Sequence, residues 1–174
     1  ENPDSYGLIE CTRRRSGKTA RAALAAFDPP SRMFNVQSGI QSKTRDDAKS
    51  FFTKVIGSFK HLPDFFIPTY DYKKIQSTLG FRHPGNAQKL NKKARELNSD
   101  VTFKSSDNLA YDSQKLIRYI RDEFAKIDVK DPKANIVEGW SIVKPTMSLG
   151  SKSIIGKAYF TSTVEEGGSI PAQE

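Results

Sequence analysis

Short apolar runs alternate along the chain with longer segments of helical periodicity. This pattern predicts an α/β fold with a mostly parallel central sheet flanked by helices. The first run, at residues 6–11, is a short and largely apolar strand candidate. Residues 18–27 are alanine-rich and strongly helix-prone, and Pro29 and Pro30 should end that helix.

A second helix is predicted to begin at Thr44, with Asp47 three residues further on, as in a capping box. Its apolar residues recur at the i, i+3, i+4, i+7 spacing of one buried helix face. This aromatic stripe is typical of a core and not of a ligand platform. Its members are Ala48, Phe51, Phe52, Val55, Ile56, Phe59 and Leu62.

The remaining elements are predicted from shorter patterns. Strands are expected at 33–37, 77–82, 100–104, 116–121 and 154–160, and helices at 86–98 and 136–143, the last stopping near Pro145. Arg118 and Arg121 are unusual in a strand buried on both faces. Either that strand is partly exposed, or these arginines pair with acids or phosphate.

Composition narrows the class of protein. The 174 residues fit one domain, and no apolar run approaches the length of a membrane span, so no membrane partner is expected. One cysteine and two distant histidines (His61, His83) exclude an internal disulfide framework and offer no zinc-ligand spacing. The formal charge of +8 favours polyanionic partners such as DNA, RNA or nucleotides, although a merely basic surface explains it equally well.

The first candidate site is the tripeptide Gly17-Lys18-Thr19. A P-loop requires a strand, a tight loop and then a helix whose first amides face phosphates, and the elements occur here in that order. Lys18 would reach the β- and γ-phosphates, and the Thr19 hydroxyl would bind Mg²⁺. The strict motif has glycine where this chain has Thr12. The alternative is an ordinary helix start with a basic first turn, and we favour the P-loop because both flanking elements are present.

Two further groups of polar residues follow predicted strands. Asp122 could hold the Mg²⁺ shell, and Glu123 could orient or deprotonate an attacking water. Thr161, Ser162 and Thr163 end the last strand, where ligands bind in open α/β sheets, and could sense the γ-phosphate or the polarised water. Taken alone, the acids would be solvated surface and the hydroxyls a turn.

Three consecutive arginines precede the glycine of the loop. One of Arg13, Arg14 and Arg15 could stabilise transition-state charge as an internal arginine finger. The others could face solvent, DNA or a neighbouring subunit.

Together these motifs resemble the large terminase subunit of tailed bacteriophages. The resemblance lies in an arginine-rich deviant Walker A at 12–19, an apolar strand ending in Asp-Glu at 120–123, and a hydroxyl-rich segment at 160–166. The stretches at 110–112 and 140–145 look like terminases of crAss-like and related Bacteroidetes phages.

The resemblance implies an ASCE-type P-loop ATPase that binds ATP and Mg²⁺ and drives double-stranded DNA through a portal into a procapsid. It implies a catalytic carboxylate at Glu123, a loop arginine at Arg14 and a metal-binding Asp122. It also implies a phosphate-binding loop, made of Arg15, Ser16, Gly17, Lys18 and Thr19. It implies a coupling segment as well, made of Thr161, Ser162 and Thr163.

The resemblance also sets expectations for the whole protein. Residues 1–166 would form the ATPase domain, lacking the family's upstream adenine-contacting segment, and 167–174 a flexible tail or the start of a linker to a nuclease domain. No nuclease activity is expected from this chain. Expected partners are double-stranded DNA, the portal protein and procapsid, the small terminase subunit and other copies in a ring, commonly of five. The expected location is the host cytoplasm and, transiently, the portal vertex.

Two other functions are compatible with the sequence. One is another P-loop translocase of helicase type, although no single-strand-reading motif follows. The other is a non-enzymatic, basic DNA-binding module in which Gly-Lys-Thr is accidental, although no helix-turn-helix or RNA-binding signature is present.

Overall fold

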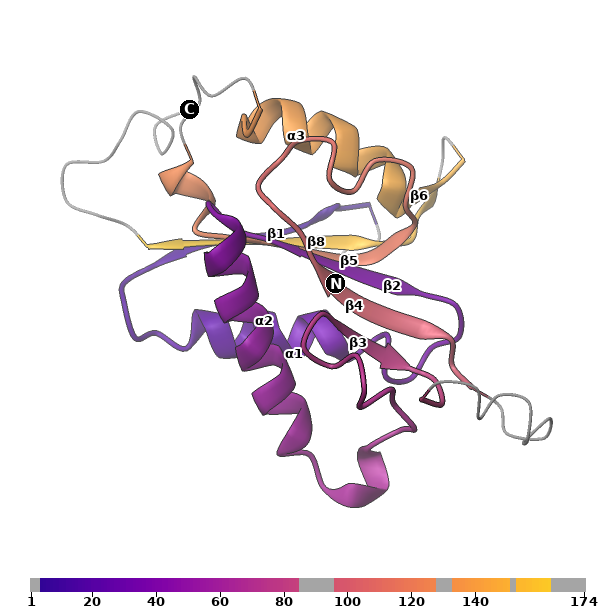
Figure 1. Cartoon of the computed structure of the whole chain (residues 1–174). Helices are drawn as coiled ribbons and strands as arrows, with labels where there is room; N and C mark the ends of the chain where they lie inside the picture. Colours follow the sequence, from indigo (N-terminus) through magenta and orange to yellow (C-terminus); the bar gives the residue numbers. More distant parts are fainter. Residues whose placement is uncertain (1–3, 85–95, 128–132, 151–152, 164–174) are drawn as a thin grey trace.

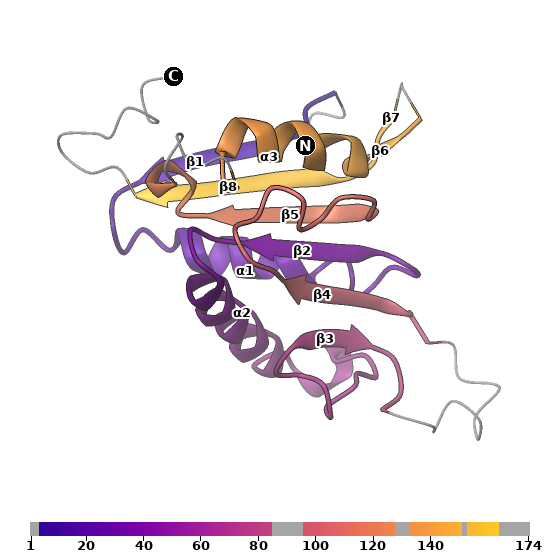
Figure 2. The same ribbon diagram turned by 45° about the horizontal axis from the view of Figure 1, so that its top comes forward.

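A six-stranded sheet forms the centre of the molecule (Figure 2). The structure is a computed structural model that describes residues 4–84, 96–127, 133–150 and 153–163. The strand order is β1-β8-β5-β2-β4-β3, and all neighbours are parallel except β3 and β4. The strands are β1 Gly7–Thr12, β2 Gln37–Gln41, β3 Thr78–Phe81, β4 Ser99–Phe103, β5 Leu116–Asp122 and β8 Lys157–Thr163.

Helices cover both faces of this sheet (Figure 1). Helices α1 (Lys18–Phe27) and α2 (Arg45–Lys60) pack on one face, and α3 (Ile136–Val143) packs on the other. The predicted cap of α2 is confirmed, because the Thr44 hydroxyl accepts a hydrogen bond from the Asp47 amide at 3.1 Å. The expected α/β architecture, with a mostly parallel sheet between helices, is therefore confirmed.

The larger core lies between the sheet and helices α1 and α2. It contains the predicted apolar face of α2, and four of that helix's large side chains are at most 1% exposed: Phe51, Phe52, Val55 and Phe59. A second core beneath α3 is built around Tyr111, Tyr119 and Met147. None of the helices in the described ranges is long and apolar enough to cross a membrane.

Short elements connect the main ones. They are the 3₁₀ helices η1 (Asp64–Phe66), η3 (Phe124–Lys126) and η4 (Lys144–Met147), and a small hairpin of β6 (Ser148–Leu149) and β7 (Ser153–Ile154). The prediction of a single strand at 154–160 is wrong at its start, because residues 155 and 156 are not in a strand and separate β7 from β8. Gly156 lies between the two strands, where a Cβ atom added to this glycine would lie 2.1 Å from the Leu116 carbonyl oxygen.

The predicted position of the second strand is also wrong. The apolar residues Met33 and Phe34 lie outside the sheet and are exposed, whereas β2 contains Ser38, Gly39 and Gln41, all buried. The Gln41 side-chain amide donates to two carbonyl oxygens of the loop after β4, so this polar residue is satisfied in the interior. The helix expected at 86–98 lies mostly outside the described residues, and 96–98 are not helical.

The interior arginine of β5 has an environment that neither sequence-based alternative foresaw. Arg121 is 1% exposed, and its guanidinium donates to the Tyr119 hydroxyl at 3.3 Å and the Ser106 carbonyl oxygen at 3.2 Å. Arg121 is therefore not exposed. The partners of its guanidinium in these contacts are a hydroxyl and a carbonyl oxygen, and neither is a carboxylate. Arg118 is half-buried on the face that carries α1.

Candidate active site

The loop between β1 and α1 makes a tight turn. Arg15 and Gly17 both adopt left-handed conformations, with φ of 63° and 80°. The Gly17 carbonyl oxygen then accepts the amides of Ala20 and Arg21, each at 3.1 Å, which begins the helix. Thr12, at the place of the usual glycine, shares a 2.6 Å hydrogen bond between its hydroxyl and that of Ser16, which closes the loop.

Lys18 is the first residue of α1 and is only 7% exposed. Its ammonium donates to the Thr163 hydroxyl and lies 3.8 Å from Oε1 of Glu123. The Thr163 hydroxyl also donates to Glu123 Oε1, at 3.3 Å. Side chains that are 145 residues apart in the sequence therefore meet at the carboxyl end of the sheet.

The sheet order brings these groups together. Strand β8 lies between β1, which leads into the loop, and β5, which ends at Asp122. The Thr161 hydroxyl donates to Asp122 Oδ1 at 2.5 Å. Burial raises the pKa of the Asp122 carboxyl above its usual value, and the hydrogen bond from Thr161 opposes that rise.

The three predicted hydroxyl residues do not share one environment. They are the last three residues of β8. Alternation along a strand puts Thr161 and Thr163 on one side and Ser162 on the other. The buried Ser162 hydroxyl has no hydrogen-bond partner among the described residues, and the structure does not bring it to Lys18 or the acids.

An open hollow of about 670 Å³ lies over the loop and is within the usual size range of small-ligand sites. The predicted residues in its lining are Arg14, Arg15, Ser16, Gly17, Lys18, Thr19, Glu123 and Thr163. Three polar residues of the lining were not predicted: Lys54, Ser58 and Lys126. The periodicity of α2 points to its apolar face only, so it gave no signal for the first two.

The donor set fits a Mg²⁺ ion carried by a nucleotide. Mg²⁺ usually keeps several waters and takes only one or two carboxylates besides substrate phosphates. The half-buried carboxylate of Asp122, at the end of β5, and the hydroxyl of Thr19, in the lining of the hollow, are oxygen donors of that kind. No group of three or more histidine, cysteine or acidic side chains that could hold a metal alone occurs in the described part of the chain.

A polar cluster fixes α1 to the sheet behind the loop. Glu10 of β1 accepts hydrogen bonds from the guanidinium of Arg21 on α1 and from the hydroxyl of Tyr159 on β8. The bond from Arg21, followed by that from Tyr159, lowers the pKa of Glu10 below its usual value. Arg21 also donates to the Ser16 carbonyl oxygen at 3.1 Å, so the same side chain contacts the loop itself.

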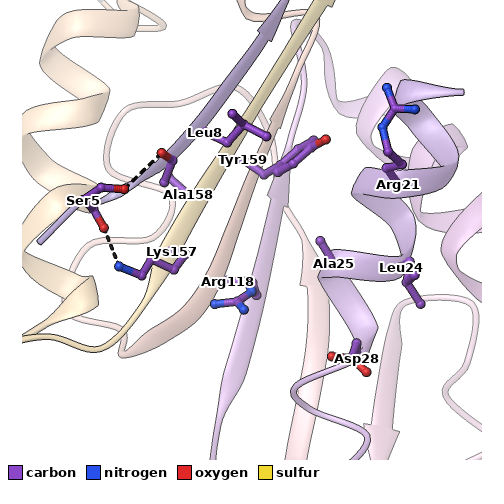
Figure 3. Close-up of a pocket in the computed structure, with 11 residues that line it drawn as sticks. Ser5, Leu8, Arg21, Leu24, Ala25, Asp28, Arg118, Lys157, Ala158 and Tyr159 are labelled. Carbon is purple, nitrogen blue, oxygen red and sulfur yellow. Dashed lines mark hydrogen bonds between the residues drawn. The ribbon is translucent and has the colours of Figure 1, made fainter. Parts of the chain in front are cut away.

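A second hollow, of about 590 Å³, lies against α1 near the amino ends of β1, β5 and β8 (Figure 3). Its lining includes Leu8, Leu24, Arg118 and Lys157. None of the predicted site residues lines it. Most of the predicted site residues therefore line the hollow over the loop, at the carboxyl end of the sheet. Asp122, Thr161 and Ser162 lie at the same ends of β5 and β8 but are not part of that lining.

Two solved structures share this arrangement. The Thermus phage P74-26 large terminase ATPase domain matches with 26% identity and a TM-score of 0.64, and a mutant of that domain matches with 28% identity and a TM-score of 0.63. Each match covers 91% of this chain and 59% of the other. The fold is that of a terminase ATPase domain.

This likeness confirms the expected ASCE-type P-loop class of the terminase-like fold, with its mostly parallel six-stranded sheet. The chain spans about three-fifths of the length of the terminase structures that it matches. No protein-family model matches the chain, and no curated protein matches it.

Proposed function

We propose that this chain is the ATPase part of a phage DNA-packaging motor, which hydrolyses ATP to move double-stranded DNA into a procapsid. The observation that carries the proposal is the meeting of Lys18, Glu123 and Thr163 over a left-handed loop turn. The likeness to a terminase ATPase domain supports the same proposal. A P-loop translocase of helicase type would share the meeting of these side chains but not the likeness to a terminase, and a non-enzymatic DNA-binding module accounts for neither observation.

In this proposal, the loop amides and the Lys18 ammonium hold the β- and γ-phosphates of ATP. Arg14 and Arg15 line the same hollow, and one of them neutralises charge that develops on the γ-phosphoryl group. Asp122 and Thr19 would hold Mg²⁺, which would supply positive charge to the phosphates when bound.

Glu123 is the proposed general base. A water oxygen attacks the γ-phosphorus while the bond from that phosphorus to the β–γ bridging oxygen breaks, and one water proton passes to the Glu123 carboxylate. ADP and phosphate are the products. Because Thr163 bonds to both Lys18 and Glu123, its hydroxyl is placed to respond when phosphate draws Lys18 away, which is the proposed coupling role.

The wider assignments are part of the same proposal. We propose residues 1–166 as the ATPase domain and 167–174 as a tail or linker. We also propose a ring of copies that works with the small terminase subunit at the portal of the procapsid, in the host cytoplasm. The sequence stretches at 110–112 and 140–145 favour a crAss-like or related Bacteroidetes phage as the source.

Two substitutions test the chemistry. Lys18→Ala should abolish ATP binding, whereas Glu123→Gln should bind ATP but lose hydrolysis by about 100-fold or more, since it keeps the shape and removes the base. Binding is measured with a fluorescent ATP analogue and turnover by phosphate release. Assays with linear duplex and portal-bearing procapsids test stimulation by the motor's partners.

Lys60→Ala, at the exposed end of α2, is the matched control for loss of a lysine and should behave as the wild type. Normal turnover in both Lys18→Ala and Glu123→Gln would refute an ATPase centred on this loop.

A further inference from the structure

A second lysine contacts the proposed base. The ammonium of Lys126 lies 2.9 Å from Oε2 of Glu123, while Lys18 and Thr163 approach the other oxygen, Oε1. Lys126 also lines the hollow over the phosphate-binding loop. The carboxylate thus lies between two cations, only one of which belongs to the loop.

Local backbone geometry produces this contact. Glu123 has a left-handed conformation, with φ of 52° and ψ of 37°, and directly precedes the 3₁₀ helix η3. In a 3₁₀ turn, side chains three residues apart lie one above the other, which places Lys126 beside Glu123. The Lys126 amide also donates to the Glu123 carbonyl oxygen at 3.0 Å.

The turn is anchored in the second core. The Phe124 ring packs edge-on against Phe160 of β8 at 5.7 Å between centroids, and Ala125 and Ile127 are buried. Lys126 therefore projects from a fixed backbone. Its side chain is 27% exposed, and that of Glu123 is 23% exposed.

Both side chains are partly exposed, but one buried atom distinguishes this pair from an ordinary surface ion pair, which contributes little to stability. Oε2 of Glu123 is buried, and within the described residues no group makes a well-aligned hydrogen bond to it. Lys126 is the cation beside that oxygen. A buried carboxylate oxygen without a nearby cation would be strongly disfavoured, so loss of Lys126 should turn the carboxylate toward Lys18.

We propose that Lys126 is a positioning residue for hydrolysis, holding Oε2 of Glu123 so that Oε1 faces the attacking water once phosphates engage Lys18. The inference rests on the proposed function. It assigns Lys126 no contact with the reacting atoms, and it predicts an effect on turnover and not on ATP binding.

The test uses Lys126→Met, which keeps an unbranched apolar stem but removes the charge, and Lys126→Arg, which restores a cation. For Lys126→Met we expect kcat to fall about tenfold while KM for ATP stays within about twofold, because only the base is misplaced. Lys126→Arg should recover at least about half of the lost rate. Lys60→Met is the matched control and should leave kcat and KM unchanged.

The outcomes separate the two proposals. A wild-type chain that hydrolyses ATP, with Lys126→Met equally active, overturns this inference and leaves the proposed function intact. A fall in kcat that Lys126→Arg does not relieve, in a variant with wild-type Tm, also overturns it. A wild-type chain with no turnover, even with duplex and procapsid, refutes the proposed function and this inference together.

Discussion

At the scale of single residues, the carboxylate of Glu10 connects the first strand to the helix behind the loop. Because its pKa is lowered in the folded protein, it adds stability that is present above its unfolded value of about 4.5 and lost as pH falls through the lowered value. Glu10→Gln keeps the shape but loses the charge. We expect the Tm of the Glu10→Gln variant to lie roughly 2 °C below that of the wild type at neutral pH.

Thermal denaturation at pH 7 and at about pH 3 checks this prediction, since the difference should shrink at the lower pH. Asp112→Asn is the control, because Asp112 is an exposed acid on a loop. An equal difference at both pH values would contradict a charge-based contribution from Glu10.

Single residues were predictable where their chemistry stands out against a simple pattern. Lys18 begins a helix, Glu123 follows a strand and Thr163 ends one, and the structure brings the three together. Arg121 was not predictable, because its partners are a hydroxyl and a carbonyl oxygen that only the folded chain brings near. Lys126 likewise gained a partner through a backbone conformation that the sequence does not specify.

At the scale of elements, α2 shows what an amphipathic pattern can determine. Its stripe is buried, and the Phe59 ring alone makes edge contacts with Phe27, Tyr70 and Phe81. Phe59→Ala removes all three contacts and leaves a cavity, so we expect the free energy of unfolding to fall by about 3–5 kcal/mol. Urea denaturation followed by circular dichroism measures it.

The control for this prediction is Phe65→Ala on η1, because the Phe65 residue is 81% exposed. Its effect should stay within about 0.5 kcal/mol. Similar losses for both variants would mean that Phe59 is not the packing centre that its contacts indicate.

Elements with polar interiors were harder to predict. Strand β2 has no apolar alternation, since it is built around Ser38, Gly39 and Gln41, and hydrophobicity therefore pointed to its exposed neighbours Met33 and Phe34. Gly39 lies in β2 because the Tyr111 ring packs where a side chain would be, only 2.7 Å from an added Cβ. Such complementarity arises between segments distant in sequence, which a local pattern does not contain.

At the scale of the whole molecule, the formal charge of +8 bears on the proposed polyanionic partner. Binding that releases counterions from the DNA backbone weakens steeply with salt. We expect the affinity for linear duplex to fall at least about tenfold between roughly 50 and 200 mM salt. Fluorescence anisotropy with two unrelated duplexes of equal length measures it, and the two should bind equally. Salt-independent or sequence-selective binding would contradict a backbone-tracking motor.

The position of β8 between β1 and β5 also sets the distance between those two strands. Neighbouring strands in a sheet lie about 4.8 Å apart, so one intervening strand separates the backbone of the loop strand from that of the acidic strand by roughly 9.6 Å. Direct neighbours would leave half that width. The strand therefore works as a spacer between the backbones that carry the lysine and the acids, whose side chains meet across its carboxyl end. Variants of its hydroxyls would alter the chemistry in that gap but leave the width of the gap unchanged.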